Sequence, residues 1–143
     1  MDARRVTDEV SVSPQIAVAD VAEIAAAGYR AIVCNRPDNE QAAQVPVGDI
    51  EAAALAAGLA FVAQPVASGA VTDGDGERFG EIVASLPQPV LAYCRSGTRC
   101  TMLWALSQAK ARPLDEIVQK AAHAGYDLSA LKPRLAAIKA QQA

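Results

Sequence analysis

A helix that ends in glycine and leads into a short apolar strand occurs twice in the first half of the chain. Residues 18–28, VADVAEIAAAG, place Val18, Val21 and Ile24 on one helical face and end in Gly28, after which YRAIVCN reads as a buried strand. Residues 49–58, DIEAAALAAG, followed by LAFVAQPV, repeat the arrangement. Successive units of this kind require crossover connections, so the pattern predicts parallel strands flanked by helices.

The remaining elements extend this α/β pattern. EVSVS at 9–13 and VLAYC at 90–94 indicate further strands, and DGERFGEIVASL at 75–86 indicates a helix between them. After Cys94 we expect three helices and no strand: one over 98–111, one that starts at Pro113 and one that Ser129 caps. The basic pair at residues 4 and 5 reads as a solvated N-terminal segment. We therefore expect one domain over residues 1–143, with a small parallel sheet flanked by helices.

Composition limits the partners of such a domain. Three cysteines without a secretory signal indicate free thiols in the cytoplasm, and no run reaches the roughly 18 apolar residues of a membrane span. The cysteines form no Cys-x-x-Cys pair and there is one histidine, so we expect no metal ion and no cofactor. A net charge of −3 without a long cationic cluster disfavours nucleic acid.

The stretch AYCRSGTRC, residues 92–100, carries the chemistry. Ligands of parallel α/β sheets bind at the carboxyl ends of the strands, where Cys94 lies just before a predicted helix. A loop of this kind presents backbone N–H groups and the positive end of a helix dipole to an anion, and Gly97 lets the backbone close in. With Arg95 and Arg99 nearby, Cys94 should be more acidic than free cysteine, whose pKa is about 8.5. Cys94 is therefore a candidate nucleophile.

Three segments together resemble a known family. CRSGTR after a strand is similar to the active-site loop of cysteine-dependent phosphatases and rhodanese sulfurtransferases. NRPDNE, YCRSGTR and AGYDLS together more narrowly resemble the phosphatase-like domain family found beside β-lactamase-like persulfide dioxygenase domains. The resemblance implies the dual-specificity-phosphatase fold, and the helical segment after residue 100 favours it over the rhodanese fold.

Loop length guides the choice of chemistry. Phosphatases of this fold place five residues between cysteine and arginine, whereas here four residues separate Cys94 from Arg99, as in rhodanese-like enzymes. We therefore expect a sulfurtransferase that passes sulfane sulfur from thiosulfate or a small persulfide to a thiol or cyanide through a Cys94 persulfide. The alternatives are a phosphatase that acts on phosphotyrosine or other phosphomonoesters, and a non-catalytic module that binds anions or senses redox state.

The expected roles at this site are as follows. Cys94 and Arg99 would be catalytic, and a small anionic sulfur donor would be bound by Arg95, Ser96, Gly97, Thr98, Arg36 and Asp38. Arg36 and Asp38 could instead pair with each other at the rim, and Cys100 could either resolve a Cys94 persulfide or pack in the core. Asp38, Asp73 and Asp75 are the acids available for proton transfer, although TDGDGE reads as a turn and helix start. The resemblance also implies a separate persulfide dioxygenase as a partner.

Overall fold

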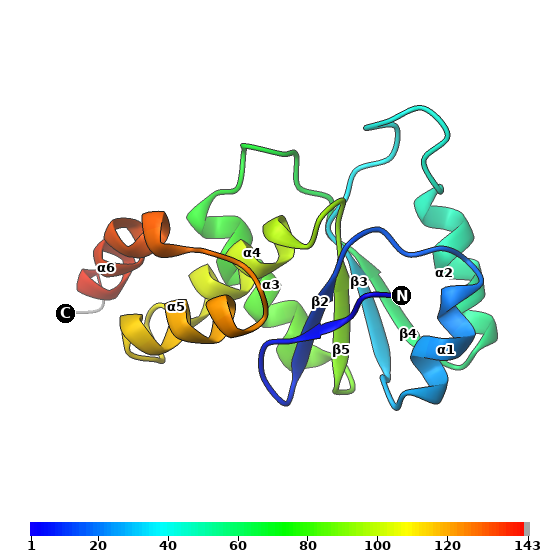
Figure 1. Ribbon diagram of the computed structural model, residues 1–143, viewed down its shortest axis with the longest axis horizontal. Coiled ribbons are helices and arrows are strands. Elements are labelled where there is room, and N and C mark those ends of the chain that lie inside the picture. The colour runs from blue at the N-terminus through cyan, green and yellow to red at the C-terminus, as the bar shows by residue number, and fades with distance from the viewer. Residues whose placement is uncertain (142–143) are drawn as a thin grey trace.

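The computed structural model of the protein describes residues 1–141, which form a five-stranded sheet and six α-helices (Figure 1). The strands are β1 (Arg4–Arg5), β2 (Val10–Ser13), β3 (Ala31–Cys34), β4 (Ala60–Ala63) and β5 (Val90–Tyr93), in the spatial order β1-β2-β5-β3-β4. β2, β5, β3 and β4 are parallel, and β1 joins the edge of β2 antiparallel. The sheet is therefore mostly parallel, as the sequence predicts.

Helices cover both faces of the sheet, as Figure 1 shows. They are α1 (Asp20–Ala26), α2 (Val47–Ala56), α3 (Asp73–Ser85), α4 (Thr98–Gln108), α5 (Leu114–His123) and α6 (Lys132–Ala140). α1 and α2 lie on one face and α3 and α4 on the other, while α5 and α6 pack against α4 and extend that core away from the sheet. Alternate side chains of each buried strand enter the two hydrophobic cores, as the two-residue period of a strand requires. None of the helices in residues 1–141 is both long and apolar enough to span a bilayer.

The predicted α/β class is confirmed, and a glycine with positive φ follows α1, α2 and α5. Gly28 and Gly58 follow α1 and α2 with φ of 99° and 81°, in the left-handed region that ends helices. Three helices follow the cysteine loop, as expected. The fold therefore has the arrangement in which ligands bind at the carboxyl edge of the sheet.

One local expectation is confirmed and two are wrong. Arg4–Arg5 is exposed as expected, and its backbone in addition pairs with β2 as a short edge strand. Val18 precedes α1 and is 45% exposed, so it does not belong to the buried face of that helix. Ser129 begins a 3₁₀ turn, Ser129–Leu131, and does not cap α6, because that helix starts only at Lys132 and its N-cap residue is Leu131.

The loops that leave the carboxyl ends of the strands gather at one edge of the sheet. Residues 35–46 follow β3, residues 64–72 follow β4 and residues 94–97 follow β5, and Figure 1 shows all three at the top of the molecule. Backbone hydrogen bonds tie them together: Asn35 N donates to Tyr93 O, and Val66 N donates to Asn35 O. This edge holds the candidate site.

Candidate active site

The end of β5 and the start of α4 position Cys94. The chain leaves β5 at Tyr93 and enters α4 at Thr98, so only four residues form the connecting loop. Gly97 caps α4 with φ of 92°, where a side chain is strained, and a Cβ on Gly97 would overlap the hydroxyl of Tyr126. The glycine is therefore required both by the turn and by the close approach of the tyrosine.

The Cys94 thiol lies at the bottom of this loop and is strongly acidic. Its side chain points to the N-terminus of α4, where the Gly97 N–H donates to Sγ at 3.1 Å, and the residue is 1% exposed. A hydrogen bond from the Cys100 thiol is the largest cause that lowers the pKa of Cys94 to about 5. The backbone N–H groups of Cys100, Gly97 and Ser96 act in the same direction, and burial opposes them. Cys94 is therefore a thiolate near neutral pH.

The other two cysteines differ from Cys94. Burial raises the pKa of the Cys34 thiol, which packs in the core on the α1 and α2 side, as the sequence predicts. Burial and the neighbouring Cys94 raise the pKa of Cys100 well above its ordinary value. Cys100 lies fully buried in the core, as the packing interpretation predicts, and it is also the leading cause of the lowered pKa of Cys94. Its predicted role as a resolving thiol stays a prediction.

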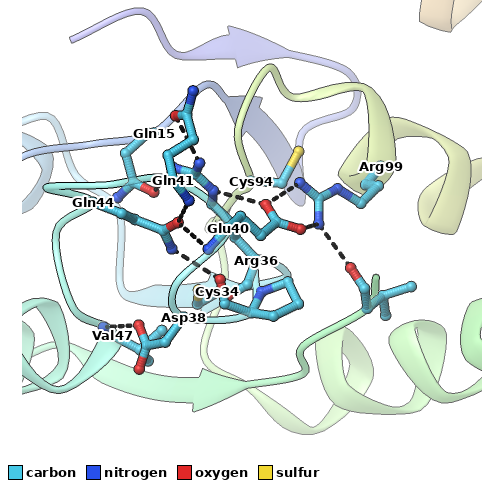
Figure 2. Close-up of polar contacts among 12 residues, drawn as sticks. Gln15, Cys34, Arg36, Asp38, Glu40, Gln41, Gln44, Val47, Cys94 and Arg99 are labelled. Carbon is cyan, nitrogen blue, oxygen red and sulfur yellow. Dashed lines mark hydrogen bonds and ion pairs between the residues drawn. The ribbon is translucent and has the colours of Figure 1, made fainter. Parts of the chain in front are cut away.

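Arg99 reaches the same site from the first turn of α4. Nη1 donates to Glu40 Oε2 and to Val66 O, and Nη2 donates to Glu40 Oε1, each at 2.8 Å. This is a two-pronged contact between guanidinium and carboxylate, with Arg99 only 7% exposed (Figure 2). The hydrogen bonds of Glu40 raise the pKa of Arg99, and Cys94 adds to that rise. Arg99 therefore faces both a carboxylate and the thiolate.

The alternative in which Arg36 pairs with Asp38 is wrong. Arg36 is 2% exposed and donates to Glu40, Gln15 and Gln41, each at 2.9 Å. Asp38 instead accepts a hydrogen bond at 2.8 Å from the backbone N–H of Val47, at the start of α2 (Figure 2). The pairing does not form because Glu40, four residues beyond Arg36 in the same loop, offers a carboxylate that Arg36 and Arg99 both contact.

The other predicted binding residues lie on the outside of the loop. Arg95, Ser96 and Thr98 are exposed, and the hydroxyl of Ser96 donates to that of Thr98 at 3.0 Å. These side chains are open to solvent, and their role in binding a substrate stays a prediction.

Each of the three candidate acids makes a contact at a helix end. Asp73 pairs with Arg134 at 2.7 Å, and Asp75 accepts from Thr72 N in a capping box at the start of α3. Together with the capping role of Asp38, these contacts assign all three aspartates to helix ends. The reading of TDGDGE as a turn and helix start is confirmed.

Two residues of the site were not singled out from the sequence. Glu40 occurs in the NRPDNE segment, and Tyr126 occurs in the AGYDLS segment. The Tyr126 hydroxyl donates to Ser96 O at 3.0 Å and contacts the loop at Gly97. Residue spacing gives no signal for Glu40, because ion pairs between residues four apart are typical of helices and residues 35–46 form a loop.

The family model and the most similar curated proteins point to the same family. The model of the phosphatase-like domain of beta-lactamase hydrolase-like proteins matches residues 2–111. A beta-lactamase hydrolase-like protein of Xylella fastidiosa (strain Temecula1) is 37% identical over 126 residues, which are 86% of this chain and 29% of that protein. The one of Agrobacterium fabrum is 32% identical over 109 residues, 76% of this chain and 25% of that protein. The chain thus spans less than a third of the length of these relatives.

Solved structures support the fold. A Neisseria meningitidis Z2491 protein described as a candidate phosphatase is 36% identical, with a TM-score of 0.87 over 96% of this chain and 99% of that one. Tk-PTP in its active form gives a TM-score of 0.76 at 14% identity, over 99% and 98% of the two chains. PTPMT1 gives 0.71 at 14% identity, over 98% of each. At such low identity the last two show the fold alone. The site described above therefore sits in a cysteine-phosphatase fold.

Proposed function

The chain belongs to the phosphatase-like domain family of beta-lactamase hydrolase-like proteins, and from this premise we propose that it hydrolyses phosphomonoesters through a phosphocysteine on Cys94. One observation carries the proposal: an acidic thiol held by backbone N–H groups at the N-terminus of a helix, with Arg99 beside it, in a cysteine-phosphatase fold. The phosphatase alternative of the sequence interpretation thereby takes precedence over sulfur transfer.

In the first step the Cys94 thiolate attacks phosphorus, the S–P bond forms and the P–O ester bond breaks. The N–H groups of the loop and the positive end of α4 stabilise the negative charge on the transferred group. In the second step water attacks phosphorus, the S–P bond breaks, and inorganic phosphate leaves with the thiolate restored. No cofactor takes part in either step.

The positions of the acids restrict the substrate class. Since Asp38, Asp73 and Asp75 are engaged at helix ends, no acid among them protonates the leaving oxygen. General acid catalysis contributes about 10² to 10⁴ in rate, so alkyl phosphates should react slowly. Aryl phosphates, whose phenolate leaves without a proton, are the expected substrates.

Steady-state hydrolysis tests the proposal. The reduced protein should release phosphate from an aryl phosphate, and it should release far less from an alkyl phosphate of similar size. Cys94→Ser should abolish hydrolysis, whereas Cys34→Ser, which removes a thiol on the other face of the sheet, should retain it. Equal activity of wild type and Cys94→Ser would contradict the proposal.

A second candidate is sulfur transfer, favoured by the loop of only six residues from Cys94 to Arg99. Here Cys94 attacks the outer sulfur of thiosulfate, an S–S bond forms and sulfite leaves; a thiol or cyanide then takes the sulfur and restores the thiolate. Sulfite leaves without a proton, so the missing acid is no obstacle. A separate persulfide dioxygenase would be a fitting partner for this reaction.

Loop length separates the two candidates. Insertion of one glycine between Gly97 and Thr98 adds a backbone donor and moves Arg99 to the phosphatase spacing. If sulfur transfer is the native reaction, the insertion should lower thiosulfate turnover and raise aryl phosphate hydrolysis. If phosphate is the native substrate, the inserted loop should hydrolyse aryl phosphate no faster than the native one. A chain that forms no adduct with either donor would instead be the anion-binding or redox module.

A further inference from the structure

The two edges of the sheet differ in charge. β1 forms one edge and β4 (Ala60–Ala63) forms the other. The β1 edge carries Arg4 and Arg5, both exposed, and Arg5 forms an ion pair with Asp8. Charged side chains on an edge strand hinder its unpaired backbone from joining another strand. The edge at β4 lacks this protection, because residues 52–72, which include all of β4, contain no Asp, Glu, Lys, Arg or His.

The pairing of β4 with β3 determines which backbone groups of β4 face outward. The N–H groups of Ala60 and Gln64 donate to backbone carbonyls at either end of β3, at 3.1 Å and 2.8 Å. Because successive residues of a strand direct their backbone groups to opposite sides, the N–H and C=O groups of Phe61 and Ala63 point away from β3. Within residues 1–141 the strand β4 pairs with β3 alone, so these outward groups have no strand partner.

The outward groups of β4 are complementary to themselves. In an antiparallel pair of strands, two residues that face each other in a hydrogen-bonded pair exchange both of their N–H···O bonds. A two-fold axis at Val62 places Phe61 opposite Ala63 of a second copy, and Ala63 opposite Phe61 of that copy. Every outward N–H and C=O of the two residues is then used, and the sheets of the two copies become continuous.

The side chains around this edge also fit a second copy. A two-fold axis brings residues close to their own counterparts, so a charged residue near the axis would meet the same charge, and residues 52–72 supply none. Val62 would face its counterpart across the axis, and β-branched side chains pack well in such pairs. The helix α2, which packs against β4, carries the most exposed large apolar side chain of residues 1–141, that of Leu55 at 59%.

We propose that the chain forms a two-fold symmetric dimer through antiparallel pairing of β4 with β4 of a second copy. The paired edge lies close to the candidate active site along the chain, because Val66, whose carbonyl accepts from Arg99, follows Ala63 by three residues. The proposal concerns assembly and does not rest on the proposed function. A strand of four residues provides a small contact, so we expect a dimer that dissociates on dilution.

Analytical ultracentrifugation over a range of protein concentrations tests the dimer. Wild type should change from monomer to dimer as its concentration rises. Ala63→Pro removes an outward N–H, and an edge strand tolerates proline where its N–H faces solvent, so this variant should fold and dimerise about tenfold or more weakly. Ala63→Ser keeps the N–H at the same exposed position and should dimerise like wild type. A wild type that stays monomeric at its highest soluble concentration, or a folded Ala63→Pro that dimerises as tightly as wild type, would overturn the proposal.

Hydrogen exchange of wild type, followed by NMR, locates the contact without any variant. The amides of Phe61 and Ala63 should exchange rapidly in dilute protein and slowly at a concentration where the dimer prevails. The amide of Gln64, which donates to the β3 side, should be protected at both concentrations. A dimer in which Phe61 and Ala63 exchange as rapidly as in the monomer would place the interface elsewhere and refute the pairing of β4.

Discussion

Removal of the Cys100 thiol should make Cys94 less acidic by a definite amount. The hydrogen bond from Cys100 is the largest of the contacts that lower the pKa of Cys94 to about 5. A hydrogen bond to a charged group contributes about 1.5–3 kcal/mol, and one pH unit corresponds to about 1.4 kcal/mol. Because a thiol is a weak donor, we take the lower value and expect Cys100→Ala to raise the pKa of Cys94 by about one.

The assay is the rate of alkylation by iodoacetamide between pH 4 and pH 9, followed on the peptide that contains Cys94. The pH at which the alkylation rate is half of its maximum, the midpoint, should be higher for Cys100→Ala than for wild type. It should stay well below the midpoint of free cysteine, because the N–H groups of Gly97 and Ser96 still stabilise the thiolate. Cys34→Ala, which removes a buried thiol from the other core, should leave the midpoint in place.

Two outcomes with folded Cys100→Ala would refute this reasoning. An unchanged midpoint would mean that the Cys100 thiol does not stabilise the thiolate. A midpoint near 8.5, the ordinary value of cysteine, would mean that the backbone donors and the end of α4 contribute nothing.

Two further changes test the packing of the loop. Gly97→Ala should lower the free energy of unfolding, measured by urea denaturation, by about 1–3 kcal/mol, because φ of 92° is strained for alanine and the new Cβ overlaps Tyr126. Unaltered stability would contradict the geometry. Tyr126→Phe removes the hydrogen bond to Ser96 O and should lower the free energy of unfolding by about 0.5–1.5 kcal/mol. It should also raise the pH midpoint of the alkylation of Cys94. An identical midpoint would show that the tyrosine does not position the loop.

The sequence predicts the architecture because its signals are local. Gly28 and Gly58 mark helix ends where the next strand begins, and Cys94 closes an apolar run just before a helix. Because the carboxyl ends of parallel strands lie at the same edge of a sheet, the loops after β3 and β5 are expected to meet there. The edge strand β1 carries no such signal, since two exposed arginines pair only through their backbone.

The contacts within the site could not be predicted in the same way. Glu40 and Arg99 are 59 residues apart, and their pairing depends on the conformation of the loop after β3. Asp38 was an equally plausible partner for Arg36 by sequence distance, and the backbone N–H at the start of α2 decides against it. The donation from Cys100 to Cys94 depends on a side-chain rotamer, which residue spacing does not determine.

Capture of the covalent intermediate tests the central claim most directly. The reduced protein is mixed with an aryl phosphate, quenched within one turnover and digested, and the peptide with Cys94 is analysed by mass spectrometry. We predict a phosphoryl adduct on Cys94 that is absent from Cys94→Ser and decays as phosphate is released. A peptide that stays unmodified while thiosulfate, offered in parallel, leaves an extra sulfur on Cys94 would contradict the phosphatase assignment.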